Sequence, residues 1–199
     1  MAGGADRASE KPADVQQRLL DSAETCYAQF GLTKTTMEDV ARWAGLSRAT
    51  VYRYFENRDD LLMGVVEREA RRTAADIGLR IRSVRDPGKY IVEGILQSLA
   101  EIPKRPALSM LFLADAVGVT SRLLLTSERL VSIGLELLLP VIEPAREKGL
   151  LRDSVDVDTT IEWIFRILTS YLTVPSPLAS SEEDMRDLLR RMLLPALLK

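Results

Sequence analysis

The sequence of 199 residues contains no histidine and only one cysteine, Cys26. Without an imidazole, the Ser-His and Cys-His arrangements of nucleophilic catalysis cannot form, and the commonest ligand of transition metals is missing. A single cysteine makes neither an intramolecular disulfide nor a zinc site, and glycine-rich phosphate loops are absent as well. The composition therefore argues against an enzyme and predicts no cofactor and no metal. Catalysis by Asp, Glu, Lys or Tyr side chains on a helical scaffold stays open as an alternative.

Long apolar runs are also missing. The most apolar segments, such as residues 135–142, are interrupted by Glu136 and Pro140 and fall short of the roughly 20 residues that a membrane span needs. The chain starts with the polar stretch MAGGADRASEKPAD, which has no signal-like character. We therefore expect a soluble, cytoplasmic protein without a membrane partner. The formal net charge is only −2, so a prediction of DNA binding has to rest on a local motif rather than on a basic surface.

Apolar residues recur at helical spacing through most of the chain, and no segment alternates as a strand would. The fold class is therefore all-α, and residues 1–13, which are small, polar and aperiodic, are expected to form a disordered arm. Glycine, proline and capping residues punctuate the pattern. The expected helices are 14–30, 37–44, 47–55, 58–84, 89–102, 106–116, 120–148, 156–173 and 182–197.

Residues 36–55, TMEDVARWAGLSRATVYRYF, have the spacing of a helix-turn-helix. Ala41 is small where two helices touch, Gly45 lies four residues on, where the turn needs a positive φ, and Val51 is the core residue of the second helix. That second helix would lie in the major groove of DNA with its N-terminal residues towards base edges. The same spacing occurs in helical proteins that never bind DNA, so a protein-interaction module is an alternative.

The second helix of this motif carries many groups that can bind DNA. Val51 and Phe55 face inward at i and i+4, which leaves an outward side made of Arg48, Ala49, Tyr52 and Arg53. Arginine makes bidentate contacts with guanine or pairs with phosphate, a methyl group meets that of thymine, and hydroxyl groups at helix starts bind phosphate. The DNA contacts predicted from these residues are Thr36, Arg48, Ala49, Thr50, Tyr52, Arg53 and Arg58.

The longer segment FGLTKTTMEDVARWAGLSRATVYRYFENRDDLL, residues 30–62, resembles the DNA-binding domain of the TetR family of transcriptional regulators. The shared elements are a helix ending in Phe-Gly, a Thr-Thr helix start, an Ala-x-x-Ala-Gly-x-Ser turn and a Tyr-x-Tyr-Phe recognition helix, with Arg58 where the family commonly has lysine. The resemblance implies a helix-turn-helix DNA-binding domain over 14–58, joined by a long helix to a ligand-binding and dimerisation domain over 59–199. It also implies a repressor that a small, largely hydrophobic inducer releases from double-stranded operator DNA. The resemblance adds Ser47 and Tyr54 to the expected operator contacts.

Candidate ligand contacts are the aromatic, methionine and arginine side chains of the later helices. They are Tyr90, Met110, Phe112, Trp163, Arg166 and Tyr171. For the aromatic residues and Met110, ordinary core packing is the alternative, and Arg166 can instead face solvent or pair with Glu162 at i−4.

The last two expected helices carry broad apolar faces, which suit a homodimer formed by four-helix packing. The resemblance places a dimer there as well, and the alternative is that these faces only fill the core of one chain.

The charge of the expected DNA-binding domain departs from the usual pattern, because residues 14–58 contain six basic and six acidic side chains. We therefore expect modest non-specific affinity and specific binding that depends on two domains docking at once. The neutral charge adds weight to the alternative of an interaction module that has lost DNA binding.

Overall fold

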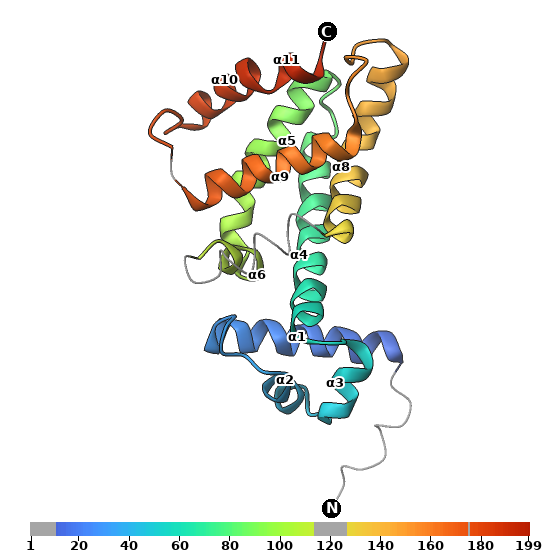
Figure 1. Ribbon diagram of the computed structural model, residues 1–199, viewed down its shortest axis with the longest axis vertical. Helices are drawn as coiled ribbons and strands as arrows, with labels where there is room; N and C mark the ends of the chain where they lie inside the picture. The colour runs from blue at the N-terminus through green and yellow to red at the C-terminus, as the bar shows by residue number, and fades with distance from the viewer. Residues whose placement is uncertain (1–10, 114–126, 175) are drawn as a thin grey trace, which may run out of the picture. The chain divides into compact units, whose positions relative to one another are not determined.

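The computed structural model describes residues 11–113, 127–174 and 176–199 (Figure 1). This part of the chain is all-α, as the sequence predicts, and its only β-type pairing is an isolated antiparallel bridge between Leu151 and Leu198. None of its helices is long and apolar enough to cross a membrane. The contacts divide the chain into two compact units, residues 1–66 and 67–199. Most of the arm expected at 1–13 lies outside the described residues, but its last two residues are helical instead of disordered, because α1 begins at Pro12, which suits the first turn of a helix.

The first unit is built on three helices, with α2 packed against both α1 and α3 (Figure 1). Its core consists of apolar side chains at helical spacing, among them Leu19, Val40 and Val51, each fully buried. Its helices are α1 (Pro12–Phe30), α2 (Met37–Ala44) and α3 (Arg48–Tyr54). The unit also includes the first residues of α4 (Arg58–Ile81).

The second unit contains the rest of α4 and a set of helices that share one apolar core. α9 crosses α5 and α8, and α10 packs against α5 (Figure 1). Ile77 of α4, Ile91 of α5, Ile142 of α8 and Ile161 of α9 are among its fully buried residues. The elements that follow α4 are α5 (Pro87–Glu101), η1 (Ile102–Lys104), α6 (Pro106–Ser109), η2 (Met110–Phe112), α8 (Glu128–Glu147), α9 (Val157–Thr173), α10 (Glu182–Met192) and α11 (Leu194–Leu197).

Two helix boundaries between α4 and α5 differ from the sequence prediction. α4 ends at Ile81 instead of reaching residue 84, because the chain turns there and the Val84 N–H bonds to the Ile81 carbonyl at 2.9 Å. α5 begins at Pro87 instead of residue 89, with the Asp86 carboxylate accepting a 2.7 Å hydrogen bond from the Lys89 N–H. Proline suits the first turn of a helix, where its missing N–H leaves no bond unmade.

The prediction of one helix over 182–197 is wrong. α10 ends at Met192 and α11 begins at Leu194, because Pro195 has no N–H to donate and its ring disfavours a continuous α-helix.

The helix expected over 106–116 is also different: its α-helical part ends at Ser109, and Met110–Phe112 form a 3₁₀ turn. Residues 114–116, and residues 120–126 of the helix expected over 120–148, lie outside the described part of the chain.

Candidate nucleic-acid interface

The start of α2 is held by a reciprocal cap. The Thr36 hydroxyl accepts a hydrogen bond from the Asp39 N–H at 3.2 Å, and the Asp39 carboxylate accepts one from the Thr36 N–H at 3.1 Å. The Thr36 hydroxyl also donates to this carboxylate at 2.6 Å, and these hydrogen bonds lower the pKa of Asp39. Thr36, a predicted phosphate contact, stays exposed at the helix start. The cap satisfies N–H groups that would otherwise have no partner within the helix.

The turn between α2 and α3 confirms the spacing of the helix-turn-helix. Gly45 adopts φ 64° and ψ 31°, a left-handed conformation that disfavours side chains with a Cβ. The Leu46 N–H then bonds back to the Ala41 carbonyl at 2.9 Å, which closes the end of α2. Ala41 and Val51 are buried on either side of this turn, so the two helices touch through the predicted residues.

α3 presents the outward face that the sequence predicts. Ser47 caps the helix by accepting a 3.1 Å hydrogen bond from the Thr50 N–H, and the two side-chain hydroxyls lie 2.9 Å apart. Val51 and Phe55 are buried in the unit core. The exposed residues of this segment are Ser47, Arg48, Ala49, Tyr52 and Arg53, whereas Thr50 and Tyr54 are half-buried.

The two arginines of α3 are held in place by neighbouring side chains. The Arg48 guanidinium pairs with Glu38 of α2, and its Nη2 donates a 3.4 Å hydrogen bond to the Tyr52 hydroxyl. The hydrogen bond with Tyr52 raises the pKa of Arg48 most, and the negative charge of Glu38 raises it further. The Arg53 guanidinium lies 5.2 Å from the centre of the Tyr54 ring, within the range of a cation–π contact.

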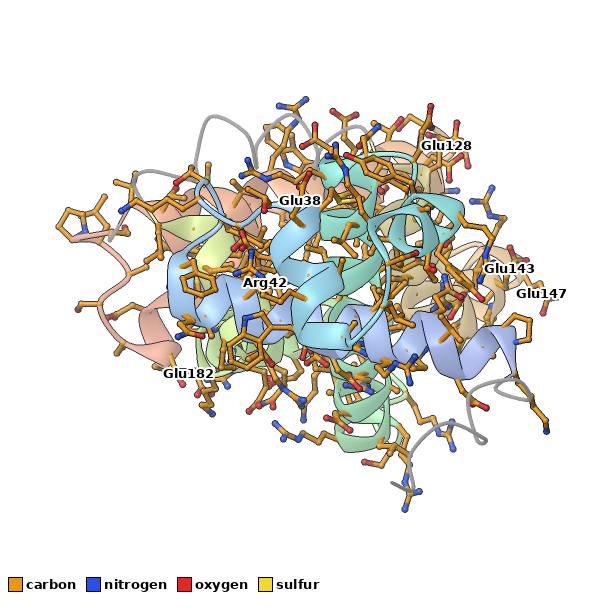
Figure 2. All side chains as sticks on the ribbon, turned by 90° about the horizontal axis from the view of Figure 1, so that it is seen from below. Glu38, Arg42, Glu128, Glu143, Glu147 and Glu182 are labelled. Atoms are coloured by element: carbon orange, nitrogen blue, oxygen red, sulfur yellow. The ribbon has the colours of Figure 1, made fainter. Side chains whose placement is uncertain are left out.

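Sequence reasoning missed Glu38 as a partner of Arg48. The side chains of Glu38 and Arg42 project from α2, as Figure 2 shows, and Arg42 pairs with Asp39 at 3.4 Å. Glu38 thus places a negative charge beside the predicted DNA-reading side chain. No local pattern in the sequence reveals this pair, because it depends on the angle between α2 and α3.

Arg58 begins α4 and is exposed. Its guanidinium donates a hydrogen bond to the backbone carbonyl of Leu32, in the loop between α1 and α2. The start of α4 is further capped by the Asn57 side chain, which accepts a 2.9 Å hydrogen bond from the Asp60 N–H. Arg58 therefore joins two segments of the first unit while its side chain remains at the surface.

The predicted ligand contacts in the second unit differ in their exposure and in their partners. Trp163 is 57% exposed, and Arg166 pairs with Glu162 at 2.6 Å, one of the alternatives that the sequence left open. Met110 and Phe112 are half-buried in η2, and Tyr171 is half-buried against the core.

Tyr90 lines two hollows among the described residues of this unit. It borders both a small apolar cavity of about 70 Å³ between α5, α8 and α9, and a groove of about 610 Å³ along α4, α5 and α8. Its hydroxyl donates a 3.0 Å hydrogen bond to the Leu137 carbonyl. Burial raises the pKa of Tyr90, so the hydroxyl stays a neutral donor.

Comparison with known proteins agrees with this geometry. The sequence model of the family described as bacterial regulatory proteins, tetR family, matches residues 19–65, which contain α2, α3 and the turn between them. An uncharacterized HTH-type transcriptional regulator of Mycobacterium tuberculosis strain H37Rv is 30% identical over 189 residues, which cover 95% of this chain and 87% of the relative.

Two solved structures share the fold over almost the whole chain. The transcriptional repressor QsdR of R. erythropolis, from the TetR family, aligns with a TM-score of 0.66 at 22% identity over 92% of this chain and 96% of its own. RolR, solved with the ligand resorcinol, aligns with a TM-score of 0.62 at 19% identity over 93% of this chain and 88% of its own. The chain is thus a member of the TetR family of bacterial regulatory proteins, transcriptional regulators that bind DNA through a helix-turn-helix.

Proposed function

We propose that the protein is a homodimeric repressor that binds double-stranded operator DNA through α3 and is released when the region over 59–199 binds a small molecule. The observation that carries the DNA-binding part is the exposed face of α3, where Arg48 and Arg53 stand with Tyr52 on a rigid, doubly capped helix-turn-helix.

The residues of this face divide into two groups by their chemistry. Arg48 and Arg53 contact base edges or phosphates, and the methyl groups of Ala49 and Thr50 meet thymine. The others contact the DNA backbone, which fixes the register of the helix without reading sequence. This second group is Thr36, Ser47, Tyr52, Tyr54 and Arg58.

A neutral DNA-binding domain makes dimerisation necessary for tight binding. Few net positive charges mean few released counterions, so one domain alone binds weakly. We place the dimer contact on the last helices, where Trp163 of α9 and Met192 of α10 are 57% and 74% exposed. Much of the apolar face expected there, including Ile161 and Leu189, belongs to the core of the chain itself. The proposed interface is therefore smaller than the sequence pattern indicates.

The remaining functional assignments follow from the family. We propose that the domain over 14–58 binds DNA and that the protein acts in the cytoplasm, where a bacterial operator lies. It works by binding alone, without catalysis or cofactor, which the regulatory function of its M. tuberculosis relative supports. The resorcinol complex of RolR supports a small-molecule ligand in principle but carries no chemistry over to this chain.

Selection of DNA from a randomised library tests this proposal. The full-length protein should enrich a site with two inverted half-sites, because a two-fold symmetric dimer presents two copies of α3 to successive major grooves. The Arg48→Ala, Arg53→Ala variant is the control, since both side chains are exposed and their loss leaves the core intact. Enrichment of a single half-site would contradict the dimer. No enrichment at all would contradict DNA binding and favour a protein-interaction module.

A further inference from the structure

A groove of about 610 Å³ runs along the surface of the second unit between α4, α5 and α8. Small residues and prolines form its middle part: Ala75 and Gly78 on α4, and Pro140 and Pro144 on α8. The two prolines lie four residues apart and therefore on the same face of α8. Neither has a long side chain that could fill the space. A volume of this size lies within the range of small-molecule sites.

One end of the groove carries three basic side chains that have no acidic partner. Arg82 and Arg85 follow the end of α4, and Lys148 follows the end of α8, which runs in the same direction as α4 (Figure 1). All three are exposed and make no hydrogen bond or ion pair within the described part of the chain. This end of the groove therefore has an unbalanced positive charge.

The charged side chains that line the other end of the groove are paired with each other. Arg71 of α4 pairs there with Glu136 of α8 at 2.6 Å and with Glu67 at 3.4 Å. Glu136 is the one acidic residue that lines the groove, and Glu143 and Glu147, labelled in Figure 2, are exposed on α8 outside its lining. The lining thus passes from a paired end through an apolar middle to a cationic end.

We infer that this groove binds a small amphipathic anion. Its carboxylate or phosphate group lies at Arg82, Arg85 and Lys148, where arginine and lysine offer charge-assisted hydrogen bonds. Its apolar body lies along Ala75 and Pro140, where burial of apolar surface stabilises it. This assignment deepens the proposed function and rests on it for the consequence of binding, because it names the chemical class of the regulating molecule.

The helix α4 lines the groove and also belongs in part to the first unit. α4 is one continuous helix from Arg58 to Ile81, and its second half forms one wall of the groove. A ligand that binds one arrangement of α4 and α8 better than another shifts the population towards that arrangement.

The basic residues also have a simpler explanation that the experiment must separate. Positive side chains at helix C-termini complement the carbonyl ends of α4 and α8 and stabilise them without any ligand. On that explanation, replacing Lys148 lowers stability and leaves ligand binding unchanged. On ours, it lowers ligand affinity.

Isothermal titration calorimetry on the full-length protein tests the inference with four probes below their micelle concentrations: decanoate, decyl phosphate, decanol and inorganic phosphate. At least one of the two charged amphiphiles should bind at one molecule per chain, and whichever binds identifies the head group. Decanol, which lacks the charge, and inorganic phosphate, which lacks the apolar body, should bind at least tenfold more weakly. Failure of both charged amphiphiles to bind, or equally tight binding of decanol, overturns the inference.

Variants then locate the site. Arg82→Gln with Arg85→Gln should weaken binding at least tenfold, and Ala75→Trp should abolish it by filling the apolar middle. Lys148→Gln should weaken binding whereas Arg146→Gln should not, because Arg146 is exposed on the same helix but does not line the groove. Equal affinities of these last two variants overturn the inference.

Operator binding is measured separately by fluorescence anisotropy on the same preparations. Intact operator binding without probe binding overturns only this inference. Probe binding without operator binding overturns only the proposed function. Thermal unfolding of each variant verifies that it is folded, and loss of stability without loss of probe affinity in Lys148→Gln assigns the cations to the helix ends. Sedimentation of Ala75→Trp tests for a second copy in the groove, and a changed oligomeric state would contradict a small-molecule site.

Discussion

The left-handed turn at Gly45 predicts a specific pattern of stability changes. A Cβ at this position would meet no atom within 4 Å, so Gly45→Ala brings no steric clash and only the cost of the backbone conformation. That cost is about 1–2 kcal/mol for a residue with a Cβ. Alanine also restricts the unfolded chain, which offsets about 0.4–1 kcal/mol. The difference of these two ranges is centred on about 0.8 kcal/mol, and we expect Gly45→Ala to lower the free energy of unfolding by about that amount.

Two further variants make this prediction sharp. Gly45→Asn should be close to the wild type, because asparagine adopts the left-handed conformation more readily than alanine does. Gly94→Ala lies in the middle of α5, where a Cβ meets only the Ile81 Cδ1 at 3.6 Å, so it should raise the free energy of unfolding by about 0.5–1 kcal/mol. Urea unfolding followed by circular dichroism measures all three variants. A Gly45→Ala protein as stable as the wild type, or a Gly45→Asn protein as unstable as Gly45→Ala, would refute the reasoning.

Three other predictions concern side-chain contacts. Glu38→Gln releases Arg48 from its ion pair and removes a negative charge from the proposed interface. The Kd for operator DNA should therefore fall by roughly two- to fivefold in an anisotropy titration. Unchanged or weaker binding would contradict the orientation of Arg48. Thr36→Ala removes the α2 cap and should cost about 1 kcal/mol in urea unfolding, whereas Thr36→Ser should keep most of the stability. Hydrogen bonds, chiefly from Arg80 and also from Lys104, lower the pKa of Glu101 from 4.5 to about 2. This carboxylate therefore stabilises the fold above pH 4.5 and loses its contribution as the pH falls towards 2. Glu101→Gln should therefore flatten the loss of stability over that interval, and an unchanged pH profile would show that the contacts do not differ between the folded and unfolded chain.

The features that the sequence predicted well depend on neighbours within a few residues. Thr36 and Ser47 cap helices that begin directly after them, and Gly45 adopts the turn conformation that its position in the motif requires. The inward orientation of Val51 and Phe55 follows from helical spacing alone. These local rules were sufficient for the helix-turn-helix and for the all-α fold class.

The features that the sequence could not predict depend on how helices pack. The pairing of Glu38 with Arg48 joins two helices, and the groove gathers residues from 71 to 150 that have no common spacing. Trp163 stays a predicted ligand contact, but its sequence position did not indicate that more than half of its surface is exposed. The break before Pro195 could have been predicted, because proline in a helix interior removes a hydrogen bond.

The central claim is that the outward face of α3 reads operator DNA, and a fluorescence-anisotropy titration tests it most directly. The DNA is the fragment immediately upstream of the gene for this protein, titrated at two salt concentrations with the wild type and with the Arg48→Ala, Arg53→Ala variant. We expect the wild type to bind this DNA far more tightly than random DNA, and the variant to lose that preference while remaining folded. Binding by the variant as tight as by the wild type, or equal binding of the wild type to both DNAs, would contradict the claim.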